Sequence, residues 1–105
     1  MSVLLGSSGV CWSADFQKGW DAYNSGDYAT ALKEWTSLAK QGNAFTQTLL
    51  GYMYSKGEGV PQDYQTAIKW YTLAAKQGDD SGQLHLGGMY ANGQGVPQDY
   101  QTAVK

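Results

Sequence analysis

Residues Gly59 to Ala67 read Gly-Val-Pro-Gln-Asp-Tyr-Gln-Thr-Ala, and the same nine residues return letter for letter at Gly95 to Ala103. The offset is 36 residues (95 minus 59), and it also relates the flanking pair Leu50-Gly51 to Leu86-Gly87. Identity at a constant offset of this size is typical of proteins built from stacked copies of one small structural unit. The sequence therefore predicts a repeat protein.

The same offset extends towards the beginning of the chain, where Asp27-Tyr28 precedes Asp63-Tyr64 by 36 residues. The third copy is expected to be incomplete, because the sequence stops at Lys105, where its second helix would continue. We predict one repeat domain over 15–105, with units at about 15–42, 43–78 and 79–105.

Within the second unit, the spacing of apolar residues is that of a helix with one buried face. They fall at the i, i+3, i+4 and i+7 positions of a helical stripe, at Tyr64, Ala67, Ile68, Tyr71 and Ala74. A second helical stretch, which carries the Leu50-Gly51 pair, precedes this one. The predicted fold is all-α: an α/α superhelical solenoid of antiparallel helix hairpins.

Glycines and aspartates mark the expected contacts and ends of these helices. Gly51 lies in mid-helix, where glycine costs about 1 kcal/mol relative to alanine, so we expect a neighbouring helix to approach closely there. Gly57 and Gly93 are expected to end the first helices in the left-handed conformation. Asp63 and Asp99 are expected to cap the N-termini of the second helices.

The full pattern, Leu-Gly-x-Met-Tyr-x-x-Gly-x-Gly-Val-x-x-Asp-x-x-x-Ala-x-x-Trp-Tyr-x-x-Ala-Ala-x-x-Gly, runs from Leu50 to Gly78 and returns in part from Leu86. It resembles the Sel1-like repeat, a relative of the tetratricopeptide repeat. The first unit departs from the pattern, because it lacks the five residues that stand as Glu58 to Gln62 in the second. It resembles a capping unit, since terminal repeats often differ from internal ones.

The composition argues against several classes of function. The formal net charge is -2, and the seven lysines are scattered among nine acidic residues, so no basic stripe is present to bind nucleic acid. One cysteine, Cys11, and one histidine, His85, do not make the four ligands of a structural zinc site. No stretch approaches the roughly 20 apolar residues of a membrane span. We expect no cofactor, no metal, no nucleic-acid partner and no membrane span.

Residues 1–14 are rich in Ser and Gly and differ from the repeats. Two interpretations stay open: a signal-peptide remnant, although no Lys or Arg precedes the short apolar patch Val3-Leu4-Leu5, or a disordered arm. Because bacterial members of the family that the repeats resemble are often exported, the resemblance implies a periplasmic or secreted protein. The cytoplasm is the alternative.

Catalysis is not expected, and no residue is assigned to it. His85 lies close in sequence to Asp79 and Ser81, but the surrounding sequence offers no strand elbow or oxyanion hole of a hydrolase. Some cysteine-rich members of the family are described as β-lactamase-like, which keeps a hydrolase as a further alternative. Those members have paired cysteines, whereas this chain has none after Cys11.

The resemblance implies a concave groove lined by the first helix of each hairpin. Its side chains would recur every three or four residues along these helices. Tyr52 and Leu84 are unexpectedly apolar for solvated positions, although any one of these residues could equally be an ordinary surface residue. The expected lining is Gln17, Asp21 and Asn24; Thr48, Tyr52 and Lys56; Leu84, Gly88 and Asn92; bordered by Phe45, Leu49 and His85.

The expected function is a protein–protein interaction scaffold that binds a peptide or a partner protein through this concave face. The alternative is self-association into a homo-oligomer. An incomplete third unit would leave an apolar face uncovered, and a second copy of the chain could cover it or exchange a helix with it.

Overall fold

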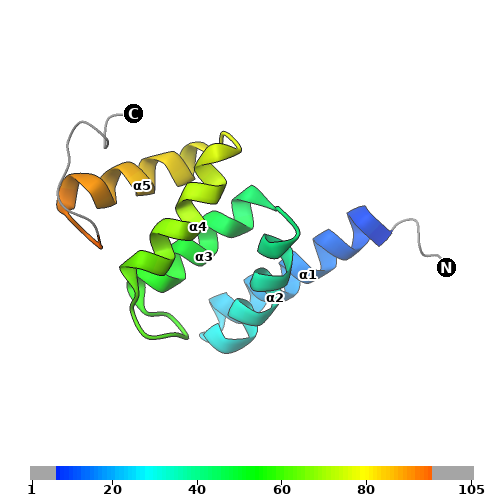
Figure 1. Cartoon of the computed structure of the whole chain (residues 1–105). Helices are drawn as coiled ribbons and strands as arrows, with labels where there is room; N and C mark the ends of the chain where they lie inside the picture. Colours follow the sequence, from blue (N-terminus) through cyan, green and yellow to red (C-terminus); the bar gives the residue numbers. More distant parts are fainter. Residues whose placement is uncertain (1–6, 96–105) are drawn as a thin grey trace.

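The described part of the chain consists of helices joined by short turns, with no strand (Figure 1). The structure is a computed structural model that describes the backbone of residues 7–95 and the side chains of residues 16–95. It contains α1 (Ser7–Asn24), α2 (Tyr28–Lys40), α3 (Ala44–Lys56), α4 (Tyr64–Lys76) and α5 (Asp80–Asn92).

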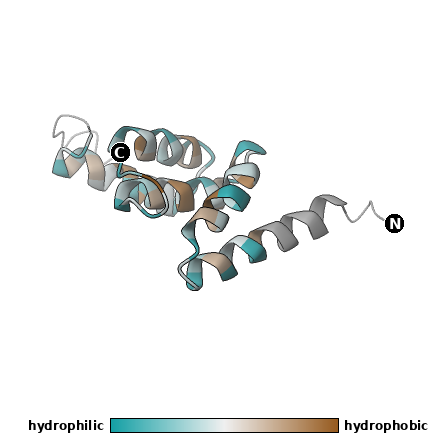
Figure 2. Ribbon diagram, turned by 90° about the horizontal axis from the view of Figure 1, so that it is seen from below, coloured by the Kyte–Doolittle hydropathy of each residue, from teal (hydrophilic) through white to brown (hydrophobic). Residues whose placement is uncertain are grey.

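The helices pack in chain order into an elongated body with extents of 51 × 27 × 17 Å. Within hairpins, α1 packs on α2 and α3 packs on α4; between hairpins, α2 contacts α3 and α4 contacts α5. Figure 1 shows α1 and α5 at opposite ends of this array. The turns between helices are hydrophilic and the hydrophobic residues lie along the helices (Figure 2). The prediction of an all-α solenoid of helix hairpins is confirmed.

Helix α1 begins at Ser7, inside the segment 1–14 that we expected to be a leader or an arm. The N-terminal boundary of the repeat domain therefore stays a prediction. The second helix expected for the third unit, with its expected cap Asp99, lies outside the described residues, so self-association through an uncovered face of that unit stays a prediction.

Each helix after α1 begins at an acidic or amide side chain that accepts a backbone N–H three residues further on. These N-caps are Asp27, Asn43, Asp63 and Asp79. The prediction for Asp63 is confirmed, because its Oδ1 accepts the N–H of Thr66 at 3.1 Å. A helix N-terminus leaves unpaired N–H groups, and a side-chain oxygen at this position satisfies one of them.

The N-cap carboxylates make the stability of the fold pH-dependent. Hydrogen bonds from Thr66 hold the pKa of Asp63 below its ordinary value, and Thr30 does the same for Asp27. Because the pKa is lower in the folded chain, this stabilisation is complete above the unfolded value of about 3.9 and is lost as the pH falls through the folded value.

Asp63→Asn is therefore expected to flatten this dependence. Asparagine caps a helix about as well as aspartate but does not titrate. The melting temperature, followed by far-UV circular dichroism, should match that of the parent chain at neutral pH and should fall less than the parent's below about pH 4. An equal fall in both proteins would contradict the assignment.

Glycines end the first helices and admit aromatic rings between the two helices of a hairpin. Gly57 and Gly93 adopt the left-handed conformation, with φ of 73° and 67°, which confirms the prediction. A Cβ on Gly51 would lie 2.5 Å from Cε1 of Tyr71, which confirms the expected close approach. The space that a Cβ would need on Gly19 is likewise occupied by the indole of Trp35.

The first hairpin is built around Trp35, which has no exposed surface. Its ring centroid lies 5.8 Å from that of Phe16, 6.2 Å from that of Trp20 and 5.6 Å from that of Tyr23. Its indole N–H donates to the carbonyl of Phe16 at 3.3 Å. Leu50 of α3 belongs to the same core cluster, so the first and second hairpins share one core.

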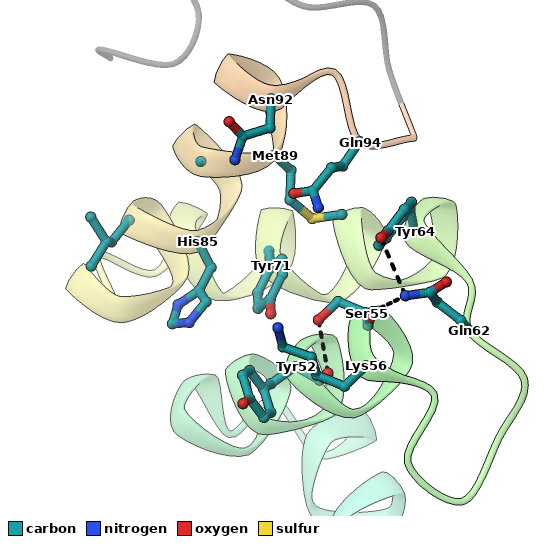
Figure 3. Close-up of a pocket in the computed structure, with 12 residues that line it drawn as sticks. Tyr52, Ser55, Lys56, Gln62, Tyr64, Tyr71, His85, Met89, Asn92 and Gln94 are labelled. Carbon is teal, nitrogen blue, oxygen red and sulfur yellow. Dashed lines mark hydrogen bonds between the residues drawn. The ribbon is translucent and has the colours of Figure 1, made fainter.

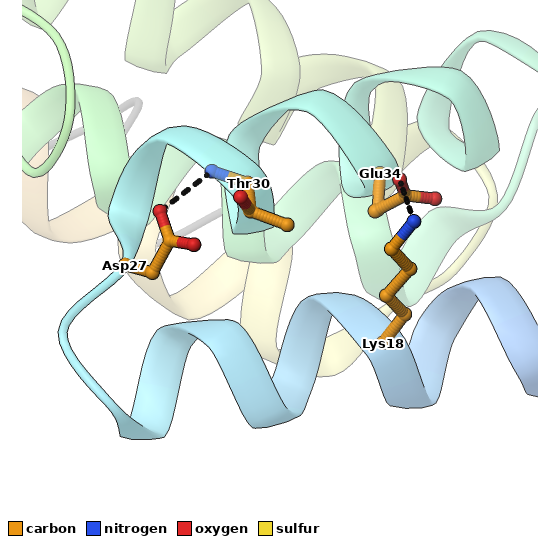
Figure 4. A network of polar contacts seen from close by, with 4 residues as sticks. All are labelled: Lys18, Asp27, Thr30 and Glu34. Atoms are coloured by element: carbon orange, nitrogen blue, oxygen red, sulfur yellow. Dashed lines mark hydrogen bonds and ion pairs between the residues drawn. The ribbon is translucent and has the colours of Figure 1, made fainter.

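An ion pair adds little to the contact between α1 and α2. Lys18 Nζ lies 3.3 Å from Glu34 Oε2 (Figure 4), but the lysine side chain is 65% exposed. Exposed ion pairs contribute at most about 1 kcal/mol, so aromatic packing holds this hairpin together.

One amide contact recurs at the repeat offset and joins each hairpin to the next. Gln47 Nε2 donates to the carbonyl of Ala39 at 3.0 Å, and Gln83 Nε2 donates to the carbonyl of Ala75 at 3.3 Å. In each case an amide in the first turns of one helix reaches the end of the helix before it. The two glutamines lie 36 residues apart in the sequence (83 minus 47), and so do the two alanines (75 minus 39).

Candidate binding surface

A cleft of about 440 Å³ lies between α3 and α5, with side chains of α4 between its two walls (Figure 3). Helix α3 and the turn after it form one wall, and α5 with the residues that follow it forms the other. The lining consists of Tyr52, Ser55, Lys56, Gln62 and Tyr64; Tyr71; Leu84, His85, Gly88, Met89, Asn92 and Gln94.

Three rings form the inner part of the cleft. Tyr71 is 1% exposed, and burial raises the pKa of its hydroxyl to about 12. The imidazole of His85 stacks on the Tyr71 ring, with 5.1 Å between centroids and 21° between planes. Tyr52 meets the same imidazole edge-on, with a centroid distance of 6.1 Å. The stack fixes the orientation of His85 within the cleft.

The hydrogen bond of His85 identifies its tautomer. Nδ1 lies 2.7 Å from the carbonyl oxygen of Ser81. A carbonyl oxygen can only accept, so Nδ1 carries the proton and Nε2 of the neutral ring is an acceptor. Because Nδ1 meets the Ser81 carbonyl rather than its hydroxyl, this geometry is that of a histidine anchored to its own helix, not of a serine–histidine catalytic pair.

Lys56 gives the cleft its positive charge. Its Nζ lies 5.6 Å from the centroid of the Tyr52 ring. None of the lining residues is Asp or Glu. Among residues 16–95 the one ion pair is that of Lys18 with Glu34, so no described carboxylate neutralises Lys56.

Gly88 leaves part of the cleft wall open. It occupies the position 36 residues after Tyr52 (88 minus 52), so a glycine stands in α5 where α3 carries a large ring. A Cβ built on Gly88 would meet no atom within 4 Å. The change from tyrosine to glycine therefore creates space that the repeat pattern would otherwise fill.

Six of the twelve residues predicted for the groove line this cleft, at Tyr52, Lys56, Leu84, His85, Gly88 and Asn92. The predicted residues of α1 do not reach it. Gln17 and Asp21 are exposed and hydrogen-bonded to each other at 2.8 Å, and Asn24 is exposed. Phe45 is exposed next to Phe16 of α1, with 5.6 Å between ring centroids.

The prediction that Thr48 lies exposed in the groove is wrong. It is 5% exposed, and its hydroxyl lies 2.6 Å from Oδ2 of Asp79, the N-cap of α5. The same oxygen accepts the N–H of Gly82. Thr48 thus joins α3 to the start of α5. Leu49 is also partly buried, against the core of the first hairpin.

Sequence reasoning missed the other half of the lining, namely Ser55, Gln62, Tyr64, Tyr71, Met89 and Gln94. Tyr64 and Tyr71 have the helical spacing of core residues, and Tyr71 is both buried and part of the cleft. Gln62 and Gln94 lie in turns, where a helical stripe gives no signal. Trp20, which is 38% exposed on α1, was also missed.

Large exposed hydrophobic side chains gather on one set of helices. Trp20, Phe45, Tyr52 and Leu84 lie on α1, α3 and α5, whereas only Leu73 lies on another described helix, α4. We call the surface formed by Trp20, Phe45, Tyr52, Leu84 and the cleft the first-helix face. A second groove, of about 450 Å³, lies between α2 and α4 and includes Lys69 and Leu73.

The described residues offer no metal site and no membrane-spanning helix. Within the described residues, no group of three or more His, Cys, Asp or Glu side chains could hold a metal ion. Across residues 7–95, no helix has both the length and the apolar character that crossing a bilayer requires. The cleft in this face is lined by aromatic rings, one lysine and several side-chain amides, which a partner could contact.

Comparison with known proteins identifies the repeats. The family model of the Sel1 repeat matches residues 44–79 and 80–105. A search of curated proteins gave no match. The chain is 42% identical to a protective antigen of uropathogenic Escherichia coli strains that displays an SLR fold, with a TM-score of 0.77 over 87% of this chain and 20% of that one. It is 34% identical to a Sel1 repeat protein from Oxalobacter formigenes, with a TM-score of 0.80 over 85% of this chain and 37% of that one.

The chain thus spans about a fifth of the first of these proteins and somewhat more than a third of the second. Two matched segments cover more than half of its own length, and both lie where the 36-residue repeat was found. The chain belongs to the Sel1 repeat family.

Proposed function

We propose that this chain is a scaffold that binds a peptide or a partner protein through the first-helix face, without catalysis. Proteins built from Sel1 repeats generally mediate protein–protein interactions. One observation carries the choice of face: four of the five large hydrophobic side chains exposed in the described part lie on α1, α3 and α5. Large exposed apolar side chains next to polar groups are typical of protein-interaction sites.

Tyr52 and Leu84 are the best anchors on this face. Leu84 is 75% exposed and Tyr52 is 36% exposed, and both line the cleft. Tyrosine is among the residues that contribute most to binding energy when a partner fully desolvates them, and an exposed leucine adds apolar area that a partner can bury. Neither side chain belongs to a core cluster among the described residues.

The double variant Tyr52→Ser, Leu84→Ser is therefore expected to weaken partner binding at least about tenfold, which corresponds to roughly 1.4 kcal/mol. Partners would be captured on the immobilised chain from cells that make it naturally, identified by mass spectrometry, and titrated in purified form. Leu73→Ser is the matched control, because Leu73 is 46% exposed but lies on α4, outside the first-helix face. Equal losses in both variants, or no loss in either, would count against the proposed face.

We also propose a periplasmic or secreted location. The likeness to a protein described as a protective antigen supports it, because a protein outside the cytoplasm is accessible to antibodies. Cell fractionation of the natural host tests this proposal, and recovery of the protein in the cytoplasmic fraction would overturn it.

A further inference from the structure

The residues that line the cleft between α3 and α5 carry positive charge but no negative charge. The chain as a whole has a formal net charge of -2, yet Lys56 is the one residue of the lining with a permanent charge, and no acidic residue lines the cleft. No described carboxylate pairs with Lys56, whose Nζ lies 5.6 Å from the centroid of the Tyr52 ring in the cleft. A cleft of this kind attracts negatively charged groups locally against the negative charge of the whole molecule.

The shape of the cleft adds a place for an apolar side chain. Gly88 leaves a notch in the α5 wall, and a Cβ there would meet no atom within 4 Å. Tyr52, Leu84 and Met89 line the same cleft and supply apolar surface around the notch. Burial of apolar area favours binding, so an aliphatic or aromatic side chain that entered the notch would strengthen the binding of its peptide.

Polar groups at the far end of α5 suit a peptide backbone. Asn92 and Gln94 line the cleft, and their side-chain amides have no hydrogen-bond partner among the described residues. An amide offers both a donor and an acceptor, which is what an extended peptide requires of a groove.

We propose that the cleft binds an acidic protein segment, which places an apolar side chain in the notch at Gly88 and a carboxylate on Lys56. This inference rests on the protein-binding function proposed above and specifies its partner. The notch selects for the apolar side chain, and the lysine selects for the charge.

The test is a selection of random short displayed peptides on the full chain, with Gly88→Tyr as the counter-selection. Tyrosine restores at position 88 the residue that the preceding unit carries at position 52, so it fills the notch with a side chain that this helix position accommodates. Circular dichroism verifies that the variant is folded, and Gly88→Leu is a second, smaller filling variant.

Enriched peptides are expected to combine Asp or Glu with Leu, Ile, Met or Phe. They should bind Gly88→Tyr at least about tenfold more weakly. Lys56→Gln should weaken them by up to about fivefold, with an effect that shrinks as salt is added. Lys69→Gln, which removes a lysine from the groove between α2 and α4, is the matched control and should leave their affinity unchanged.

Two results would overturn the inference. If the enriched peptides are basic or uncharged and still depend on Gly88, the first-helix face binds proteins but the acidic partner is wrong. If no peptide distinguishes the chain from Gly88→Tyr, the cleft is not the site. The capture experiment with Tyr52 and Leu84 then decides separately whether the chain binds a partner through the first-helix face.

Discussion

Trp35→Ala is expected to lower the free energy of unfolding by about 3–5 kcal/mol, the usual cost of truncating a fully buried aromatic residue. Trp35 has no exposed surface and contacts the rings of Phe16, Trp20 and Tyr23. Alanine would leave a cavity in the core that the first two hairpins share. Small domains are stable by only about 5–15 kcal/mol, so this loss is a large part of the total.

Urea unfolding followed by far-UV circular dichroism measures this loss without relying on tryptophan fluorescence. Trp20→Ala is the matched control, because Trp20 belongs to the same ring cluster but is 38% exposed. Its loss should be clearly smaller. Equal losses for the two variants would show that Trp35 is not the centre of the cluster.

Gly51→Ala is expected to destabilise the fold, although alanine is the better helix former. The added methyl group would lie 2.5 Å and 2.6 Å from Cε1 and Cδ1 of Tyr71, whose ring is buried and stacked on His85. Overpacking of this kind costs about 1–3 kcal/mol, and the gain in helix propensity offsets at most about 1 kcal/mol.

Gly88→Ala supplies the control in the equivalent first helix. No atom lies within 4 Å of a Cβ at position 88, so only the change in helix propensity remains. The variant should be more stable than the parent chain by up to about 1 kcal/mol. Urea midpoints of the two variants should thus move in opposite directions. If Gly51→Ala also stabilised the chain, the helices would not be as close as the contact between Gly51 and Tyr71 requires.

The fold was predictable because the features that mark helices and turns in one unit recur at the same positions in the next. Gly51 alone is an unremarkable mid-helix glycine, but its return at Gly87 indicates a required close contact. Gly57 and Asp63, which end one helix and begin the next, could be assigned from residue type and spacing. These features depend on the nearest few residues and on one neighbouring helix, which is the range over which sequence patterns are informative.

The cleft was only half predictable, because its limits depend on contacts between units. A helical stripe shows which residues share a face, but it does not show where the next unit covers that face. Thr48 lies on the predicted stripe with Tyr52, yet the start of α5 packs over it through Asp79, 31 residues away in the sequence. Gln62 and Gln94 line the cleft from the turns that follow α3 and α5. The helical spacing of apolar residues carries no information about the path of these turns.

The recurring amide contact has a consequence for any longer array of these units. Gln47 and Gln83 each tether the start of a hairpin to the terminal carbonyl region of the preceding helix. Helix ends leave carbonyl oxygens with unused acceptor capacity, so this tether has the same anchoring point in every copy. A contact that recurs once per unit restrains how far each hairpin can shift relative to the last. Together with helix packing, this side chain contributes to the curvature of the superhelix, and with it to the radius of the surface that a partner must match.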